Sequence, residues 1–395
     1  MERCASCIET AKKLVGGRVM SLARMASFVF VWAASCNKSA VERADAIAAT
    51  DIHEAGRTPQ AACAHSCSLG LCWDGCTPER FGSEGLSEVV AAPRGHVAWS
   101  NTSGIHVVAD DRVDRNVKGS HSASDGMLSL GGDLVAWCED VDCFVSVALR
   151  APKPLRFGGG KTWTSPEMHG VPTSAGPPQP MAVATNGSYI AISQFRTGGG
   201  GFPLAYSVTV FDHDGSAVQS WAYGDEMSDC AESMSAILLM DGERVIFPVG
   251  HEIKSVSVKQ PTDFRTMAVV SPAMSPSSAV VRANGGVDVL SMPCEHAIVD
   301  GTKPKKLVWA SYDSVGKLER SVNVEAGASC ELLGPALLLR NDKSGRSINR
   351  IVGNTLEPLP IEGAPVSIAS DGTSAVFVNG AVEVRRPPDV AAHLP

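Results

Sequence analysis

One short phrase recurs along most of the chain, and it constrains the fold more than any other feature. A turn glycine is followed by three or four apolar residues, a polar gap and an alternating segment. Clear copies begin at Gly95, Gly132, Gly187, Gly242 and Gly372, and weaker copies begin at Gly286 and Gly334. The intervals between these glycines average about 46 residues, a spacing typical of repeats that each form one supersecondary unit.

The segments that follow the glycine phrases alternate between apolar and polar residues. Examples are Val145–Val147, Val208–Val210, Val256–Val258 and Val382–Val384. A period of two places successive side chains on opposite faces, which is typical of a strand with one buried face. No long segment holds the period of an amphipathic helix. The sequence therefore predicts an all-β chain.

The best copies of the phrase are Gly95-His-Val-Ala-Trp99 and Gly132-Asp-Leu-Val-Ala-Trp137. Glycine, turn, Val-Ala-Trp, gap and strand together resemble the blades of TolB-like and WD40-like β-propellers. The resemblance covers most of residues 86–386. It implies a β-propeller over residues 83–390 with six or seven blades, of which seven is favoured. A pair of β-sandwiches is the main alternative.

The N-terminal region has the pattern of an export signal. The basic segment Met20–Arg24 precedes the apolar run Met25–Trp32, which is too short to span a bilayer, and the small residues Ala33–Ser35 follow. Cys36 comes next, and this order resembles the lipobox of bacterial lipoproteins, in which the cysteine is lipidated. We expect residues 1–35 to be a leader that truly starts at Met20, and residues 36–60 to be a tether. An ordinary cleaved signal, with no role for Cys36, is the alternative.

The cysteines agree with export, because disulfides persist in oxidising compartments. Four of them form a Cys-rich segment over residues 61–82, and they are Cys63, Cys67, Cys72 and Cys76. Two local disulfides are favoured there. A zinc site with His65 is an alternative, although structural zinc sites usually contain C-x2-C pairs, and free thiols are a third. Elsewhere we predict the pairs Cys138–Cys143, across a hairpin, and Cys294–Cys330, which leaves Cys230 without an assigned partner.

Signatures of catalysis are missing from the sequence. It contains neither the G-x-S-x-G of many hydrolases nor the H-E-x-x-H of zinc proteases. Gly160-Lys-Thr162 lacks the earlier glycine of a phosphate-binding loop, since Leu155 occupies that position. We therefore assign no catalytic residue, and we expect no cofactor and no metal. A net charge of −8 without a basic block disfavours nucleic acid as a partner.

One irregular region is the best candidate for ligand contact. Residues 158–180 hold five Gly and five Pro, and a second Gly-rich stretch spans residues 196–203. Long loops of this kind are usually functional or disordered. If both stretches project from one face of a propeller, they bring together the candidate ligand-binding residues Trp163, His169, Arg196 and Phe202. A surface loop without function is the alternative.

These features predict an exported, lipid-anchored β-propeller that acts as a monomeric binding or scaffolding module of the bacterial cell envelope. Its partner would be an envelope protein or a small ligand, and only the lipid anchor would touch the membrane. The alternative is an envelope enzyme (a hydrolase, lyase or quinoprotein) that uses loops of the propeller face. A purely structural propeller is a third hypothesis. Acidic or histidine side chains from at least three blades converging at the channel mouth would favour the enzyme.

Overall fold

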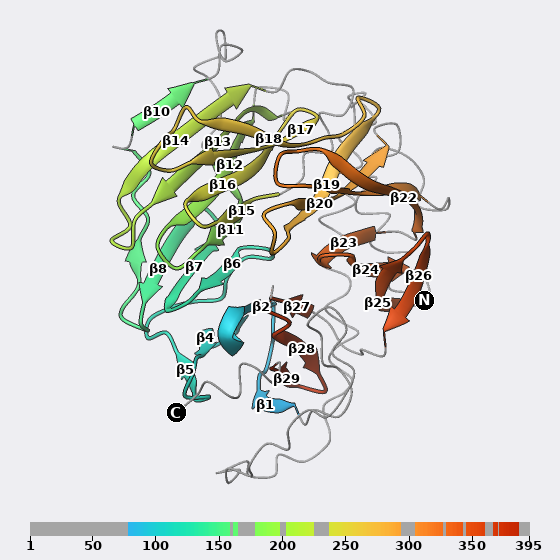
Figure 1. Cartoon of the computed structure of the whole chain (residues 1–395). Helices are drawn as coiled ribbons and strands as arrows, with labels where there is room; N and C mark the ends of the chain where they lie inside the picture. Colours follow the sequence, from blue (N-terminus) through green and yellow to red (C-terminus); the bar gives the residue numbers. More distant parts are fainter. Residues whose placement is uncertain are drawn as a thin grey trace, which may run out of the picture. The chain divides into compact units, whose positions relative to one another are not determined.

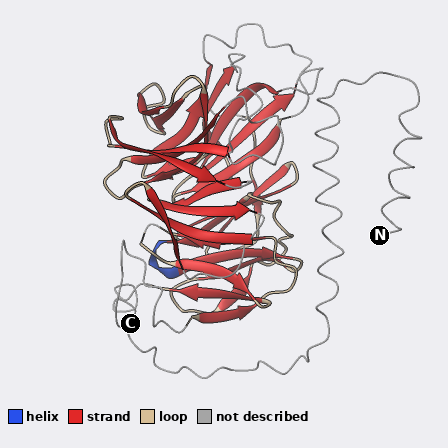
Figure 2. Cartoon of the chain, turned by 90° about the vertical axis from the view of Figure 1, so that its right-hand side faces the viewer, coloured by secondary structure: helices blue, strands red, loops and turns tan. Residues whose placement is uncertain are grey.

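The structure is a computed structural model of the whole chain. It describes residues 78–158, 161–164, 178–197, 203–224, 237–293, 305–326, 329–342, 345–359, 366–369 and 371–386. The chain divides into two units, Met1–Pro59 and Gln60–Pro395, and all the described residues belong to the second unit. They are almost entirely strands (Figure 2), with one short 3-10 turn, η1 (Pro93–Gly95).

The strands form seven sheets, which we number as blades in chain order (Figure 1). Blade 1 contains β2 (Glu88–Ala92), β3 (His96–Asn101), β4 (Gly104–Val108) and β5 (Asp114–Asn116). Blade 2 contains β6 (Leu128–Gly131), β7 (Leu134–Glu139), β8 (Asp142–Val147) and β9 (Lys153–Pro154). Blade 3 contains β11 (Gln179–Thr185), β12 (Ile190–Thr197), β13 (Pro203–Phe211) and β14 (Ala217–Gly224), and β10 (Lys161–Thr164) adds a fifth strand parallel to β14.

The remaining blades have four strands each. Blade 4 contains β15 (Leu239–Asp241), β16 (Arg244–Val249), β17 (Glu252–Ser257) and β18 (Phe264–Val269). Blade 5 contains β19 (Met274–Val281), β20 (Val287–Pro293), β21 (Lys305–Tyr312) and β22 (Leu318–Ala326). Blade 6 contains β23 (Ser329–Gly334), β24 (Leu337–Asp342), β25 (Gly345–Val352) and β26 (Thr355–Leu359). Blade 7 contains β27 (Val366–Ile368), β28 (Ser374–Val378), β29 (Ala381–Arg385) and β1 (Glu79–Gly82).

The first strands of the blades form a closed circuit. In chain order, β2, β6, β11, β15, β19, β23 and β27 each contact the next, and β27 contacts β2. This arrangement is a seven-bladed β-propeller, which confirms the all-β prediction and the favoured blade count. Two separate sandwiches would not produce this closed order.

The seven glycine phrases correspond to the second strands of the seven blades. Each glycine lies just before or at the start of a second strand, and these strands are β3, β7, β12, β16, β20, β24 and β28. The alternating segments are third strands, among them β8, β13, β17 and β29. The repeat found in the sequence is therefore the centre of each blade.

Both faces of each sheet are buried against neighbouring blades. Seven apolar clusters each join two adjacent blades, and together they complete the ring. Trp99 lies between blades 7 and 1, Trp137 between blades 1 and 2, and Trp221 between blades 3 and 4, and all three are fully buried. Burial on both faces explains why the second strands are continuous apolar runs rather than alternating ones.

The N-terminal strand closes the ring. β1 pairs antiparallel with β29, so the outer strand of blade 7 comes from the opposite end of the chain. Its first two residues add ionic contacts, because Arg80 pairs with Glu383 and Glu79 pairs with Arg386. β1 lies within residues 61–82, which the sequence analysis assigned to the Cys-rich segment, and the described propeller thus begins at Glu79.

Candidate functional site

The contact residues predicted from the sequence belong to blade 3 and its connections. Trp163 lies in β10, and Arg196 is an exposed residue of β12. His169 and Phe202 lie outside the described residues. The register places the last residues of β10, β12 and β14 at one end of the sheet. The described ends of β10 and β12, which contain Trp163 and Arg196 and precede residues 165–177 and 198–202, therefore lie at one end of blade 3.

Most of the predicted cysteine sites lie outside the described residues: Cys36, Cys63, Cys67, Cys72, Cys76, Cys230 and Cys294. The structure does contain the disulfide between Cys138 and Cys143, which joins β7 to β8 across their hairpin. Cys330 is a half-buried residue of β23. Its predicted partner is not described, so that pair stays a prediction.

A shallow apolar depression borders the disulfide hairpin on the rim of blade 2. Its lining residues are Val141, Asp142, Cys143, Phe144, Pro154, Leu155 and Phe157. Val141, in the turn between β7 and β8, is 47% exposed, and Phe157, just after β9, is 38% exposed. The Phe157 ring packs edge-on against Phe211 of blade 3, with 4.9 Å between centroids. The depression therefore lies where blade 2 meets the five-stranded blade 3.

Side chains of the inner strands bond to the backbone of the next blade. The Ser129 hydroxyl accepts from the Thr185 amide at 3.1 Å, and the Ser278 hydroxyl accepts from the Leu332 amide at 3.1 Å. The Ser367 hydroxyl accepts from the Ala91 amide at 2.9 Å. These bonds satisfy amides at the inner edges of sheets, which have no further strand to pair with.

Between blades 1 and 2 a carboxyl group accepts a backbone amide of the next blade. The Glu88 carboxylate in β2 accepts from the Met127 amide at 3.1 Å. The pKa of Glu88 is raised to about 8, chiefly by burial and also by the negative charges of Asp125 and Glu331, against the hydrogen bonds from two backbone amides. These three acidic residues come from blades 1, 2 and 6 and sit near the starts of inner strands.

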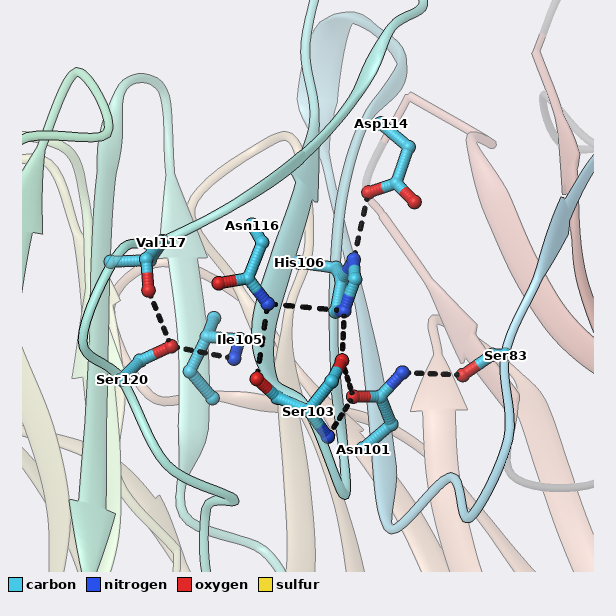
Figure 3. A network of polar contacts seen from close by, with 9 residues as sticks. All are labelled: Ser83, Asn101, Ser103, Ile105, His106, Asp114, Asn116, Val117 and Ser120. Atoms are coloured by element: carbon cyan, nitrogen blue, oxygen red, sulfur yellow. Dashed lines mark hydrogen bonds and ion pairs between the residues drawn. The ribbon is translucent and has the colours of Figure 1, made fainter.

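A second polar network links three strands of blade 1 (Figure 3). Ser103 lies in the tight turn between β3 and β4, His106 in β4 and Asp114 in β5. His106 Nε2 is 2.8 Å from Ser103 Oγ, and His106 Nδ1 is 2.9 Å from Asp114 Oδ1. The imidazole stacks on the Trp99 indole, with 5.2 Å between centroids and 8° between planes. Ser103 is exposed, whereas His106 is half-buried.

Two asparagines hold this network in place. Asn101 Oδ1 accepts from the Ser103 amide at 2.8 Å and from the Ser103 hydroxyl at 2.7 Å. Asn116 Nδ2 donates to the Ser103 carbonyl and lies 3.2 Å from His106 Nε2. The sequence did not single out these residues, because its ten histidines are scattered singly along the chain. The available signal was that Ser103, His106 and Asp114 fall within one predicted blade.

The described residues limit some other kinds of site. Within them, no three His, Cys, Asp or Glu side chains are grouped so that they could hold a metal ion. No helix in the described part of the chain is long and apolar enough to cross a membrane.

Comparison with known proteins yields similar structures but no family. No model of a protein family matches the chain, and no curated protein matches its sequence. The β-propeller domain of the Trilobed protease from Pyrococcus furiosus is similar over 75% of this chain and 90% of that chain, at 9% identity and a TM-score of 0.46. AztD from Citrobacter koseri is similar over 79% of this chain and 93% of that chain, at 13% identity and a TM-score of 0.41. BamB from Moraxella catarrhalis is similar over 76% of this chain and 84% of that chain, at 11% identity and a TM-score of 0.36. Similarity at this level assigns no function.

Proposed function

We propose that this protein is an exported, lipid-anchored binding or scaffolding module of the bacterial cell envelope. The export signal and the cysteine at its end support the location. The Cys138–Cys143 disulfide supports it independently, because cross-strand disulfides persist in oxidising compartments and are rare in reducing ones. Cys36 is the proposed point of lipid attachment, and it would hold the propeller at the membrane surface.

The apolar depression on the rim carries the binding part of the proposal. Exposed apolar patches bounded by polar surface mark sites of protein association more often than chance. Here Val141 lies in the turn of the hairpin that the disulfide joins, and Phe157 is packed against Phe211, so the surface is held in shape before any partner arrives. Such preorganisation lowers the entropic cost of binding. The proposed partner is an envelope protein that presents an apolar side chain to this depression. A small ligand held by Trp163, His169, Arg196 and Phe202 at the end of blade 3 is the second kind of partner.

The envelope enzyme remains the second candidate function, and one observation favours it. Glu88, Asp125 and Glu331 come from three blades and interact near the starts of inner strands, which is the distribution expected of an enzymatic channel mouth. However, the contact of Glu88 with the Met127 amide gives it a role in joining blades. Carboxylates engaged in this way favour the binding module.

Site-specific photo-crosslinking in the native envelope tests the rim surface. A photoreactive amino acid would replace Val141 or Phe157 in the full chain, and a control would carry it at Val315, which is 80% exposed in the turn between β21 and β22. We expect the two rim positions to crosslink to the same envelope protein and the control position to give no such product. Equal crosslinking from all three positions, or none from the rim, would overturn the proposed binding surface.

A further inference from the structure

We propose that Ser103 is an activated nucleophile, with His106 as its general base and Asp114 as the carboxylate that orients the base. The chemical class it would react with is the activated ester, from which Ser103 would accept the acyl group. The proposal rests on the two contacts in line, Ser103 Oγ to His106 Nε2 at 2.8 Å and His106 Nδ1 to Asp114 Oδ1 at 2.9 Å. This order of hydroxyl, imidazole and carboxylate is the arrangement that activates serine in unrelated folds.

The partners of His106 fix its tautomer. Asp114 can only accept when ionised, so Nδ1 carries the hydrogen. Asn116 Nδ2 can only donate, and it also donates to the Ser103 carbonyl, so its contact with Nε2 needs a lone pair on that nitrogen. These contacts place the hydrogen on Nδ1 and leave the lone pair of Nε2 facing both Asn116 Nδ2 and the Ser103 hydroxyl. This is the tautomer that a general base requires.

Neighbouring side chains fix the positions of the His106 imidazole and of Ser103. Trp99 is fully buried and stacks almost parallel to the His106 ring, which fixes the plane of the imidazole. Asn101 binds the Ser103 amide and competes with His106 for the Ser103 hydroxyl, at 2.7 Å against 2.8 Å. A hydroxyl shared between two acceptors can turn its proton to His106 without moving its oxygen. Because Ser103 is exposed on a tight turn, an ester can approach its oxygen from solvent.

Water is the only reactant besides the ester that this reaction needs. Ser103 Oγ would attack the ester carbonyl carbon, forming a C–O bond while its proton passes to His106 Nε2. The tetrahedral intermediate would expel the alcohol, which takes that proton from His106, and leave an acyl group on Ser103. Water would then attack the acyl carbon with His106 again accepting the proton, and the carboxylic acid and free Ser103 result.

Ser188 provides a matched control serine in the same chain. It is exposed, it lies in a tight turn, and its amide donates to Asn186 two residues earlier at 2.9 Å, as the Ser103 amide does to Asn101. Among the described residues no histidine is in hydrogen-bond contact with Ser188. A comparison of the two serines therefore isolates the effect of His106.

The test is covalent labelling of the purified full chain with an alkyl fluorophosphonate and with p-nitrophenyl acetate, followed by peptide mass spectrometry. We expect Ser103 to be labelled at least about 10-fold faster than Ser188, and His106→Gln and Asp114→Asn each to slow that labelling about 10-fold or more. Ser188→Ala should leave labelling of Ser103 unchanged. Circular dichroism and thermal melting would establish that each variant is folded.

Two results would overturn the proposal. One is labelling of Ser103 no faster than that of Ser188 in the unsubstituted protein, which needs no variant to fold. The other is labelling of Ser103 that stays unchanged in folded Asp114→Asn. Either outcome would assign the network to the stability of blade 1 alone, and neither would bear on the binding surface around Phe157.

Discussion

Glu88 makes with a carboxyl group the kind of contact between blades that other inner strands make with serine. A serine hydroxyl accepts the amide of the next blade without changing its charge, whereas a carboxyl group at the same kind of contact changes charge with pH. Burial and two neighbouring acidic residues favour the neutral form, which raises the pKa of Glu88 to about 8 from 4.5. The contact between blades 1 and 2 at Glu88 therefore makes the stability of the fold depend on pH.

The sign of this effect follows from the raised pKa. As pH increases from 4.5 to 8, the unfolded chain releases the Glu88 proton while the folded chain keeps it, so the free energy of unfolding falls across this window and levels off above it. The substitution Glu88→Gln keeps an oxygen for the Met127 amide and removes the charge. We expect this variant to match the unsubstituted protein near pH 4.5 and to be more stable at pH 8 by about 2–4 kcal/mol. Urea unfolding at both pH values measures the difference.

An exposed glutamate supplies the control for that experiment. Glu84→Gln removes the same charge from the connection between β1 and β2, where the side chain is exposed. Its effect on stability should stay within about 0.5 kcal/mol at either pH. If Glu88→Gln changes stability no more than Glu84→Gln does, the carboxyl group is already ionised without cost in the folded protein.

At the scale of elements, strands differ in how well the sequence predicts them. The second strands, such as β7 and β12, were predictable because burial on both faces demands continuous apolar runs. The outer strands were not, since short exposed segments such as β5 (Asp-Arg-Asn) carry no apolar period. β1 escaped prediction because its partner, β29, lies at the other end of the chain. The Ser103 network escaped for a related reason, because register rather than sequence spacing brings Asp114 to His106.

Closure by β1 depends more on an ion pair with a buried arginine than on one with an exposed arginine. Arg386 is 4% exposed, and its described partners are Glu79 and the Gly95 carbonyl. Glu79→Ala would leave the buried guanidinium of Arg386 without a carboxylate, so we expect a loss of about 3–5 kcal/mol in the free energy of unfolding. Arg80→Ala removes the neighbouring pair with the buried Glu383 carboxylate, but the Arg80 side chain is 60% exposed and Arg385 stays 3.6 Å from Glu383, so the loss should be only about 1 kcal/mol. Urea unfolding of both variants checks this order, and equal losses would contradict it.

At the scale of the whole molecule, the closing strand is also the strand nearest to the proposed anchor along the chain. The tether and the Cys-rich segment lead from Cys36 directly into β1, so any force on the anchor would act on the strand that closes blade 7. In the other six blades, the outer strand comes from the same stretch of the chain as the rest of its blade. The proposal that Cys36 carries lipid therefore bears on stability as well as on location.

Intact mass spectrometry of protein isolated from membranes, under non-reducing conditions, tests the anchor. We expect a mature N-terminus at Cys36 with added acyl mass, and we expect Cys36→Ala to lose that mass and to move to the soluble fraction, because each buried methylene contributes about 0.8 kcal/mol to membrane binding. Reduction should then add two hydrogens for every disulfide, at least for the Cys138–Cys143 pair. A chain that begins at Met1 and carries reduced thiols would contradict export, and zinc would then become the better explanation for Cys63, Cys67, Cys72 and Cys76.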